Sequence, residues 1–221
     1  TVVSPRLAYL GVPSINPVMN PVMLPITLLA PEVVAPPSGA GIDSGVGSGV
    51  GSDLSNIRSS KERISGGGSP SGPISFMDVY DTVANVVKSG GKTRRAARMQ
   101  TLRVWHPDIK EFIRVKSEQE RVLGLLAEQG VNIGFNSEAR KNARYQNSNL
   151  SVRITDEFME AYKKNGRWQT RAVHNNDRSM PEYSARELMH EIAEGTWICG
   201  DPGVQFEDTI NRAHTCKTSG P

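Results

Sequence analysis

From residue 73 onward, apolar and polar positions alternate with the periods of regular secondary structure. The stretch PISFMDVYDTVANVVKSGG places apolar side chains three or four positions apart, which predicts an amphipathic helix over residues 74–89. The apolar stripe of this helix consists of Phe76, Val79, Tyr80, Val83, Val86 and Val87. Pro73 before the helix and Gly90 and Gly91 after it are typical of helix boundaries.

Further along the chain, predicted strands alternate with predicted helices. Apolar runs predict strands at 97–104 and 149–154. Helical periodicity and end signals predict helices at 106–116, 118–130, 155–166 and 184–198, with a polar loop at 136–146. Pro107 and Asp108 are expected in a first helical turn, and Ser184 and Glu187 have the spacing of a capping box. Together these elements predict an α/β fold whose strands are largely parallel.

The N-terminal part of the chain has a different composition. Residues 1–40 hold eight of the chain's 14 prolines and only two charged side chains, which favours irregular or extended backbone. Residues 41–72 are rich in glycine and serine, as flexible linkers are. The regular GVGSGVGS within them also fits glycines that allow a close approach of the backbone.

Charge and cysteine content limit the class of protein. The formal net charge of +3 comes from 26 cationic and 23 acidic residues, so bulk charge does not indicate nucleic-acid binding. Two cysteines, Cys199 and Cys216, are too few for a disulfide-stapled secreted scaffold, so a cytoplasmic protein is expected. No membrane partner is expected either, because prolines interrupt the apolar N-terminal stretch every few residues.

The stretch KSGGKTRRAARM suggests a phosphate-binding P-loop, but its spacing does not fit. A P-loop needs a glycine five residues before the one that precedes the lysine. That position is occupied by Val86, and Gly91, Lys92 and Thr93 follow a predicted helix where a P-loop opens one. Nucleotide hydrolysis at this motif is therefore excluded.

No catalytic or metal-binding constellation stands out from the residue spacing. The four histidines do not have the spacing of zinc ligands, and Cys199 reads as a small buried hydrophobe. Glycine-rich stretches beside Arg94 and Arg95 do offer backbone N–H donors and guanidinium groups suited to phosphate. The residues alone thus indicate a nucleotide or another phosphorylated ligand, with a solvated basic patch as the alternative.

Three long stretches resemble a known enzyme family. The first runs from GSGVGSDLSNIRSSKERISGGG to RVWHPDIKEFI. The second is YQNSNLSVRITDEFMEAY, and the third runs from ARELMHEIAEGTWICGDPGVQF to EDTINRAHTC. All three are similar to the catalytic barrel of the adenosylcobalamin-dependent (class II) ribonucleotide reductases. The resemblance implies that residues 46–221 form the N-terminal part of a ten-stranded α/β barrel. Residues 1–45 do not match the family and are expected to be an irregular segment rich in proline and glycine.

The same resemblance implies the reaction and its partners. The family reduces ribonucleotides to deoxyribonucleotides by radical chemistry, with adenosylcobalamin as cofactor and a thioredoxin-like reductant. A ribonucleoside-diphosphate reductase is expected, although triphosphates stay open as substrates. Deoxynucleotides and ATP are the expected effectors. The helix at 74–89 is expected to pair with a second subunit, and Lys92, Arg94 and Arg95 match the basic exit from that helix.

Site residues are carried over from the family by position. The residues expected to bind substrate are Gly49, Gly51 and Ser52. The residues expected to bind the effector are Arg58, Arg63, Gly66, Gly67 and Ser69. The loop expected to relay effector identity to the substrate base, called the specificity loop below, contributes Arg140, Lys141, Arg144 and Gln146.

The resemblance implies no catalytic residue within this chain. The family's radical cysteine lies in an Asn-Pro-Cys motif, and neither Cys199 nor Cys216 matches it or the redox pair. The chain is therefore expected to be a fragment that is inactive alone. A non-catalytic nucleotide-binding module and one chain of a split reductase are the alternatives.

Overall fold

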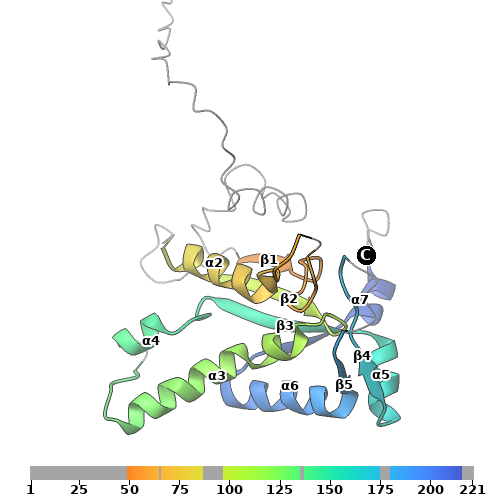
Figure 1. Cartoon of the computed structure of the whole chain (residues 1–221). Helices are drawn as coiled ribbons and strands as arrows, with labels where there is room; N and C mark the ends of the chain where they lie inside the picture. The colour runs from red at the N-terminus through yellow and green to blue at the C-terminus, as the bar shows by residue number, and fades with distance from the viewer. Residues whose placement is uncertain (1–48, 65, 87–96, 135–136, 175–179, 216–221) are drawn as a thin grey trace, which may run out of the picture. The chain divides into compact units, whose positions relative to one another are not determined.

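A computed structural model describes residues 49–64, 66–86, 97–134, 137–174 and 180–215 (Figure 1). All of these residues belong to one unit, Pro36–Pro221. The predicted irregular segment 1–45 lies outside the described residues, so its prediction stays untested. The same is true of Gly90 and Gly91, of the basic exit at 92–95, and of Cys216.

Four parallel strands form the main sheet. In chain order the elements are β1 Gly49–Asp53, α2 Gly72–Val86, β2 Ala97–Arg103, α3 Ile109–Glu128, α4 Glu138–Asn142, β3 Ser148–Ile154, α5 Asp156–Lys163, β4 Arg167–Gln169, β5 Glu182–Ser184, α6 Ala185–Cys199, β6 Gly203–Phe206 and α7 Glu207–Ala213. The sheet has the order β1-β2-β3-β6, and β4 pairs with β5 in a separate antiparallel ribbon. The prediction of an α/β fold with largely parallel strands is confirmed.

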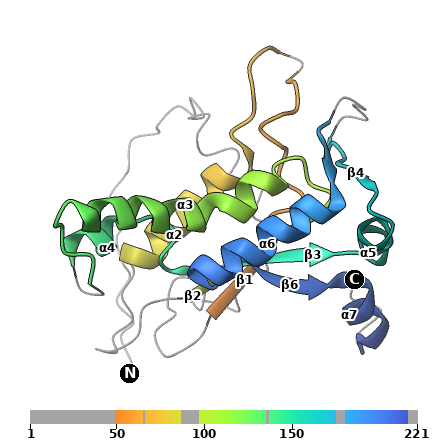
Figure 2. The same ribbon diagram turned by 90° about the horizontal axis from the view of Figure 1, so that it is seen from below.

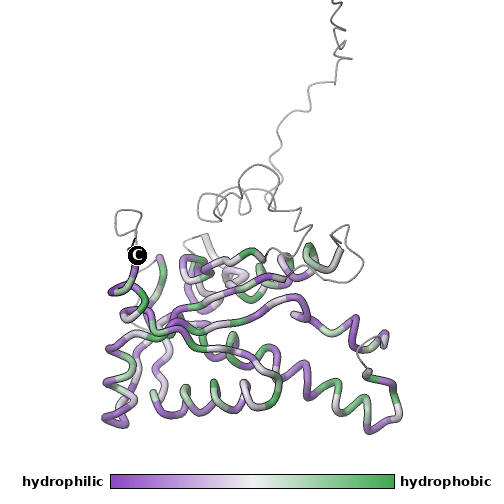
Figure 3. Tube along the Cα trace, turned by 180° about the vertical axis from the view of Figure 1, so that it is seen from behind, coloured by the Kyte–Doolittle hydropathy of each residue, from purple (hydrophilic) through white to green (hydrophobic). Residues whose placement is uncertain are grey.

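The long helices lie on one side of this sheet (Figure 2). Side chains alternate between the two faces of each strand, and Leu102, Val152 and Ile154 are fully buried on the face that the helices cover. Phe112 of α3 and Ile192 of α6 are buried as well. Figure 3 displays the matching alternation of hydrophobic and hydrophilic positions along the helices. The described core is thus a single layer between helices and sheet.

The start of α6 agrees with the capping signal predicted from the sequence, and the start of α5 carries a cap that the sequence analysis did not name. The side chain of Ser184 accepts a hydrogen bond from the backbone N–H of Glu187 at 3.4 Å, as its place in a capping box predicts. Thr155 caps α5 in the same way, accepting from the N–H of Phe158 at 3.2 Å. The predicted helices at 155–166 and 184–198 are confirmed.

Three predictions between residues 106 and 146 were wrong. The predicted helices at 106–116 and 118–130 form one continuous helix, α3, because the hydroxyl of Ser117 bonds the carbonyl oxygen of Arg114 inside the helix and interrupts nothing. Pro107 and Asp108 precede this helix and do not lie in its first turn. The predicted polar loop 136–146 contains the short helix α4, whose N-terminus is capped by Ser137.

Candidate functional site

The residues predicted to bind substrate lie on both faces of the sheet. The face opposite the helices is called the helix-free face below. Gly51 pairs in register with Met99, which is 37% exposed. Ser52 pairs with Gln100, which is fully buried on the helix side. Because faces alternate along a strand, Gly49 and Gly51 lie on the helix-free face and Ser52 lies on the other. A methyl group added at Gly51 would meet nothing within 4 Å.

Small and polar residues, together with Met99, make up this helix-free face within the described strands. By register they are Gly51, Met99, Thr101, Asn149, Ser151, Gly203 and Gln205. The amide of Gln205 contacts the sulfur of Met99 at 3.9 Å, across β3. Hydroxyl and amide groups beside glycine can hydrogen-bond a sugar or a base without a bulky side chain in the way.

A network of four charged residues, which the sequence analysis did not predict, lies at the carboxyl ends of the strands. Arg103 of β2 reaches Glu207, which follows β6, at 2.9 Å, and Arg153 of β3 reaches Asp53 of β1 at 3.3 Å. Each arginine therefore crosses a neighbouring strand to find its partner. Ligands of parallel sheets bind beyond the carboxyl ends of the strands, and that rule applied to these strand ends could have pointed to the network.

The predicted effector residues lie on the loop after β1 and vary in exposure. Arg58 is half-buried and pairs with Glu62 at 3.8 Å. The remaining four, Arg63, Gly66, Gly67 and Ser69, are all exposed. Gly67 has a φ of 86°, a conformation that glycine adopts without strain. An exposed turn of this kind offers backbone N–H groups to an anion.

Buried carboxylates hold the base of this effector loop. Glu62 accepts hydrogen bonds from the backbone N–H groups of Val173 at 2.8 Å and His174 at 3.1 Å. Asp108 accepts from the hydroxyl of Ser59 at 2.9 Å and from both the N–H and the hydroxyl of Ser60 at 2.8 Å. The loop is thus fixed to the start of α3 while its tip stays exposed.

His106 completes this anchor as a neutral ring. Its Nδ1 accepts from the N–H of Asp108 at 3.1 Å, so Nε2 carries the proton and donates to the carbonyl oxygen of Ile57 at 2.9 Å. The ring is fully buried. Burial lowers the pKa of His106 below its ordinary value near 6.5, against the opposing effects of the Ile57 hydrogen bond and of Asp108 and Glu62.

The chain should therefore lose stability as the pH falls below that ordinary value. At pH values between the folded and the unfolded pKa of His106, the ring is protonated in the unfolded state but not in the folded state. The free energy of unfolding therefore falls with falling pH, by up to about 1.4 kcal/mol per pH unit. Urea titrations from pH 7.5 to 5.5 would measure this slope. The slope should flatten in His106→Gln and persist in the control His190→Gln, at an exposed position of α6. Equal slopes in all three proteins would contradict the assignment.

The predicted specificity loop precedes β3, and acidic partners hold both of its arginines. Arg140 contacts Glu120 of α3 at 2.6 Å, and Arg144 contacts Asp78 of α2 at 2.6 Å. The exposed side chain of Lys141 pairs with Glu138 within α4 at 3.0 Å. Gln146 lies at the junction with β3, where its amide approaches the carbonyl oxygen of Arg144 at 3.5 Å.

The effector loop and the specificity loop are not brought together within this chain. The loop after β1 lies near the start of α3, whereas α4 lies beside the far end of that helix, in two perpendicular views (Figures 1 and 2). A ligand that contacts both loops would need a further chain or a rearrangement. Family resemblance assigns roles to single residues, so it did not predict that the two loops lie apart.

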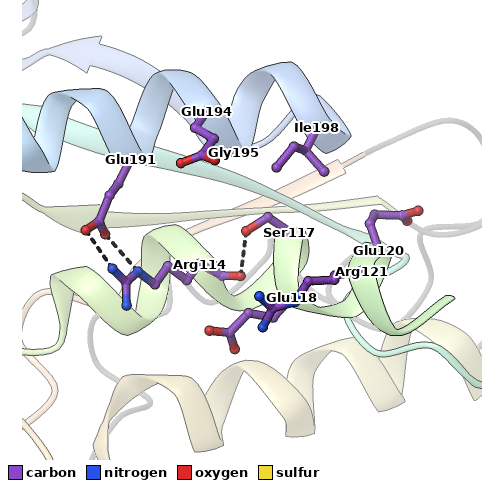
Figure 4. A pocket seen from close by; sticks show the side chains of 9 residues that line it. All are labelled: Arg114, Ser117, Glu118, Glu120, Arg121, Glu191, Glu194, Gly195 and Ile198. Carbon is purple, nitrogen blue, oxygen red and sulfur yellow. Dashed lines mark hydrogen bonds and ion pairs between the residues drawn. The ribbon is translucent and has the colours of Figure 1, made fainter. Parts of the chain in front are cut away.

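A groove of about 730 Å³ between α3 and α6 contains none of the predicted site residues (Figure 4). Its walls are mostly charged, and Arg114 donates to both carboxylate oxygens of Glu191, at 2.9 and 2.7 Å. Glu120 connects the groove to the specificity loop, because it lines the groove and also pairs with Arg140. We therefore place the candidate site on the helix-free face and its flanking loops.

Side chains that could bind a metal ion are scattered among the described residues. None of their histidine, cysteine, aspartate and glutamate side chains gather in groups of three or more that could hold a metal ion. Both ring nitrogens of the buried His106 are already hydrogen-bonded, so it offers no ligand to cobalt. No helix in the described part of the chain is long and apolar enough to cross a membrane.

Comparison with known proteins gives consistent matches. Residues 39–221 match the family model of the ribonucleotide reductase barrel domain. A vitamin B12-dependent ribonucleotide reductase from Rhodopirellula baltica is 56% identical over 169 residues, which cover 76% of this chain and 16% of that protein. One from Streptomyces avermitilis is 44% identical, covering 83% of this chain and 18% of that protein. A vitamin B12-dependent ribonucleoside-diphosphate reductase from Mycobacterium tuberculosis is 36% identical over 73% of this chain, and the match spans 20% of that relative.

Proposed function

The chain belongs to the ribonucleotide reductase barrel-domain family, and from this premise we propose that it supplies nucleotide-binding surfaces to the radical reduction of ribonucleotides. The chain spans less than a fifth of the length of the Rhodopirellula and Streptomyces relatives. The complete reaction is therefore a proposal for the protein to which these surfaces contribute. The proposed location of the reductase is the cytoplasm, where deoxyribonucleotides are needed for DNA synthesis.

The observation that carries this proposal is the helix-free face of the sheet. Bulky apolar residues normally fill the space next to a parallel sheet, which is usually covered on both faces. Here exposed glycine and amide groups take their place at Gly51 and Asn149, and the hydroxyl-bearing Thr101 between them is 8% exposed. A substrate ribose and base could lie against such a face, with the specificity loop at its amino end and the network of charges at its carboxyl end.

Adenosylcobalamin is proposed as cofactor because the relatives are named vitamin B12-dependent. When bound, the cofactor supplies the radical that begins the reduction. The proposed part of the described residues is to bind and orient nucleotides. Ribonucleotide substrate, deoxynucleotide or ATP effectors and a thioredoxin-like reductant are the proposed partners.

Dimer formation through α2 is proposed on the exposure of its apolar side chains. Val79 is 47% exposed and Phe76 is half-buried, although both lie on the predicted apolar stripe. A helix that leaves part of its apolar stripe uncovered gains stability by pairing with another surface. A second copy of the chain is the partner that the family resemblance implies.

A purely nucleotide-binding role for this chain is the second candidate, and Cys199 favours it. Its thiol lies within 3.3 Å of the carbonyl oxygens of Gly195 and Asp201, and burial raises its pKa, with weaker opposing effects from Asp201 and Lys116. A thiol held protonated in this way is a poor nucleophile and a poor redox group. Reduction would then depend on cysteines supplied from elsewhere.

Calorimetric titration of the 221-residue chain with dTTP, dATP and CDP tests the proposal. We expect saturable binding that Arg63→Ala weakens about tenfold for the effectors, because one hydrogen bond to a charged group contributes about 1.5 kcal/mol or more. Arg167→Ala is the matched control, since Arg167 is an exposed arginine of β4. A folded chain that binds none of these nucleotides would refute the proposed function.

A further inference from the structure

We infer that Glu62 is a positioning residue that couples the effector loop to the antiparallel ribbon of β4 and β5. A nucleoside triphosphate bound by Arg58 and Arg63 would then also steady the ribbon. This inference rests on the proposed function of the effector loop and extends it to a part of the chain to which the family resemblance assigned no role. Its basis is the position of Glu62, which lies beside Arg63 in the loop and contacts the segment after β4.

The carboxylate of Glu62 is buried and binds groups from two distant segments. Glu62 is 2% exposed, and one of its oxygens accepts from the N–H of Ser59, at 3.2 Å, within the effector loop. The same oxygen accepts from the N–H of Val173, 111 positions away, and the other accepts from the N–H of His174. Hydrogen bonds to a charged acceptor are strong, and a buried one is little weakened by water. One side chain therefore joins the effector loop to the ribbon.

Arg58 is a cation that Glu62 faces, and its guanidinium keeps capacity for a ligand. Its Nε lies 3.8 Å from an oxygen of Glu62, which is too far for a hydrogen bond. This buried atom has no hydrogen-bond partner among the described residues. An arginine held by charge and not by hydrogen bonds keeps N–H donors for an anion, and its fork-shaped group fits phosphate. The side chain is 30% exposed, so a phosphate can reach it.

Lys61, the residue before Glu62, contacts the second strand of the ribbon. Its ammonium group donates to the hydroxyl of Tyr183 in β5 at 3.2 Å and to the carbonyl oxygen of Pro107 at 2.7 Å. It also lies 5.9 Å from the centre of the Tyr183 ring. Two consecutive residues of the effector loop thus contact both the segment after β4 and β5 itself. A movement of the loop would therefore break contacts on both arms of the ribbon.

The first arm of the ribbon is also attached to the end of β2, by contacts that do not involve the effector loop. The indole N–H of Trp168 donates to the carbonyl oxygen of Val104 at 3.0 Å. The backbone N–H of Arg171 donates to the carbonyl oxygen of Trp105 at 2.8 Å. These contacts are independent of a ligand on the loop. The next residues along the chain are the ones that Glu62 binds, so an effect of the ligand should begin there.

Effector binding and the ribbon contact should strengthen each other. A phosphate bound by Arg58 and Arg63 restricts the exposed loop, and a restricted loop keeps the carboxylate of Glu62 at its N–H partners for more of the time. Coupling between two sites is reciprocal, so breaking the ribbon contact weakens effector binding by the same factor. Typical couplings change an affinity by about fivefold or more.

Hydrogen exchange of backbone amides tests this coupling in the 221-residue chain. With saturating dATP or dTTP, we expect the N–H groups of Val173 and His174 to exchange at least about fivefold more slowly. The N–H of Arg171 is the internal reference and should not change. The amide of Glu62→Gln has one acceptor oxygen in place of two, so this protection should be lost. Calorimetry should show that Glu62→Gln binds the same effectors at least about fivefold more weakly.

Glu157→Gln is the matched control, because the exposed Glu157 pairs with Arg171 at 2.8 Å beside the same segment. It should leave the protection and the effector affinity unchanged. Effector binding without protection of Val173 and His174 would overturn the inference, and so would protection that survives in Glu62→Gln. A folded chain that binds neither dATP nor dTTP is a distinct result, which refutes the proposed function and the inference together.

Arg58→Gln provides the test if Glu62→Gln does not fold. It removes the proposed phosphate ligand and leaves the carboxylate of Glu62 in place. We expect it to weaken effector binding about tenfold, as the loss of one hydrogen bond to a charged group does. Without effector, the exchange of Val173 and His174 should match that of the original chain. With effector, their protection should be lost, and protection of unchanged size would overturn the inference.

Discussion

Replacing Asp108 by alanine should lower the free energy of unfolding by about 3–4 kcal/mol. Asp108 is 1% exposed and is the acceptor for the hydroxyl of Ser59 and for both donors of Ser60. Each hydrogen bond to a charged group contributes about 1.5–3 kcal/mol, and buried donors left without an acceptor add to the loss. The three contributions do not add fully, because the loop can relax toward water once it is released.

Urea denaturation followed by circular dichroism would measure this loss. Glu111→Ala is the matched control, since Glu111 lies one turn further along α3 and accepts only from Lys61 at 2.9 Å on an exposed surface. A surface ion pair of this kind contributes about 1 kcal/mol or less. Equal losses in the two variants would mean that Asp108 does not anchor the loop.

Replacing Gly72 by alanine should cost about 2–5 kcal/mol through a different mechanism. Gly72 begins α2 with a φ of 73°, which an L-residue adopts only with strain of roughly 1–2 kcal/mol. The added methyl group would also meet the Cβ of Ser60 at 2.9 Å and a carboxylate oxygen of Asp108 at 3.0 Å. Forcing atoms into such a contact costs about 1–3 kcal/mol more.

Gly130→Ala separates these two costs. Gly130 has a φ of 80°, but a methyl group there would meet nothing within 4 Å. It should therefore lose only the conformational part, roughly 1–2 kcal/mol, in the same denaturation experiment. If both variants lost the same free energy, the close packing of Gly72 against the effector loop would be disproved.

Local signals predicted much of the fold. The cap at Ser184 depends on neighbours within one helical turn, so it can be read from the sequence. The apolar stripe predicted for α2 is only partly covered, because Met77 and Ala84 are buried while Val79 is 47% exposed. The polar run around Ser117 was misread as a break in α3, because a helix surface that faces solvent needs no apolar period. The strands β4, β5 and β6 have only three or four residues each, too few for a pattern.

The site was harder to predict, because its contacts join distant residues. Asp53, Arg103, Arg153 and Glu207 lie about 50 positions apart and meet only when the sheet forms. Asp81, which accepts hydrogen bonds from the backbone N–H groups of Tyr145 and Asn147, reads in the sequence as an ordinary polar residue of an amphipathic helix. The specificity loop itself stays a prediction from family resemblance.

The order of strands in the sheet has a consequence for how the protein is made. The order of the strands in the main sheet follows their order along the chain, so β2 pairs with β1, β3 with β2, and β6 with β3. Chains leave the ribosome from the amino end, and domains begin to fold as they emerge. Among the described strands of this sheet, β2, β3 and β6 can each pair without waiting for a later one. The sheet can therefore grow during translation, one crossover at a time, with each new strand added to an edge that has already formed.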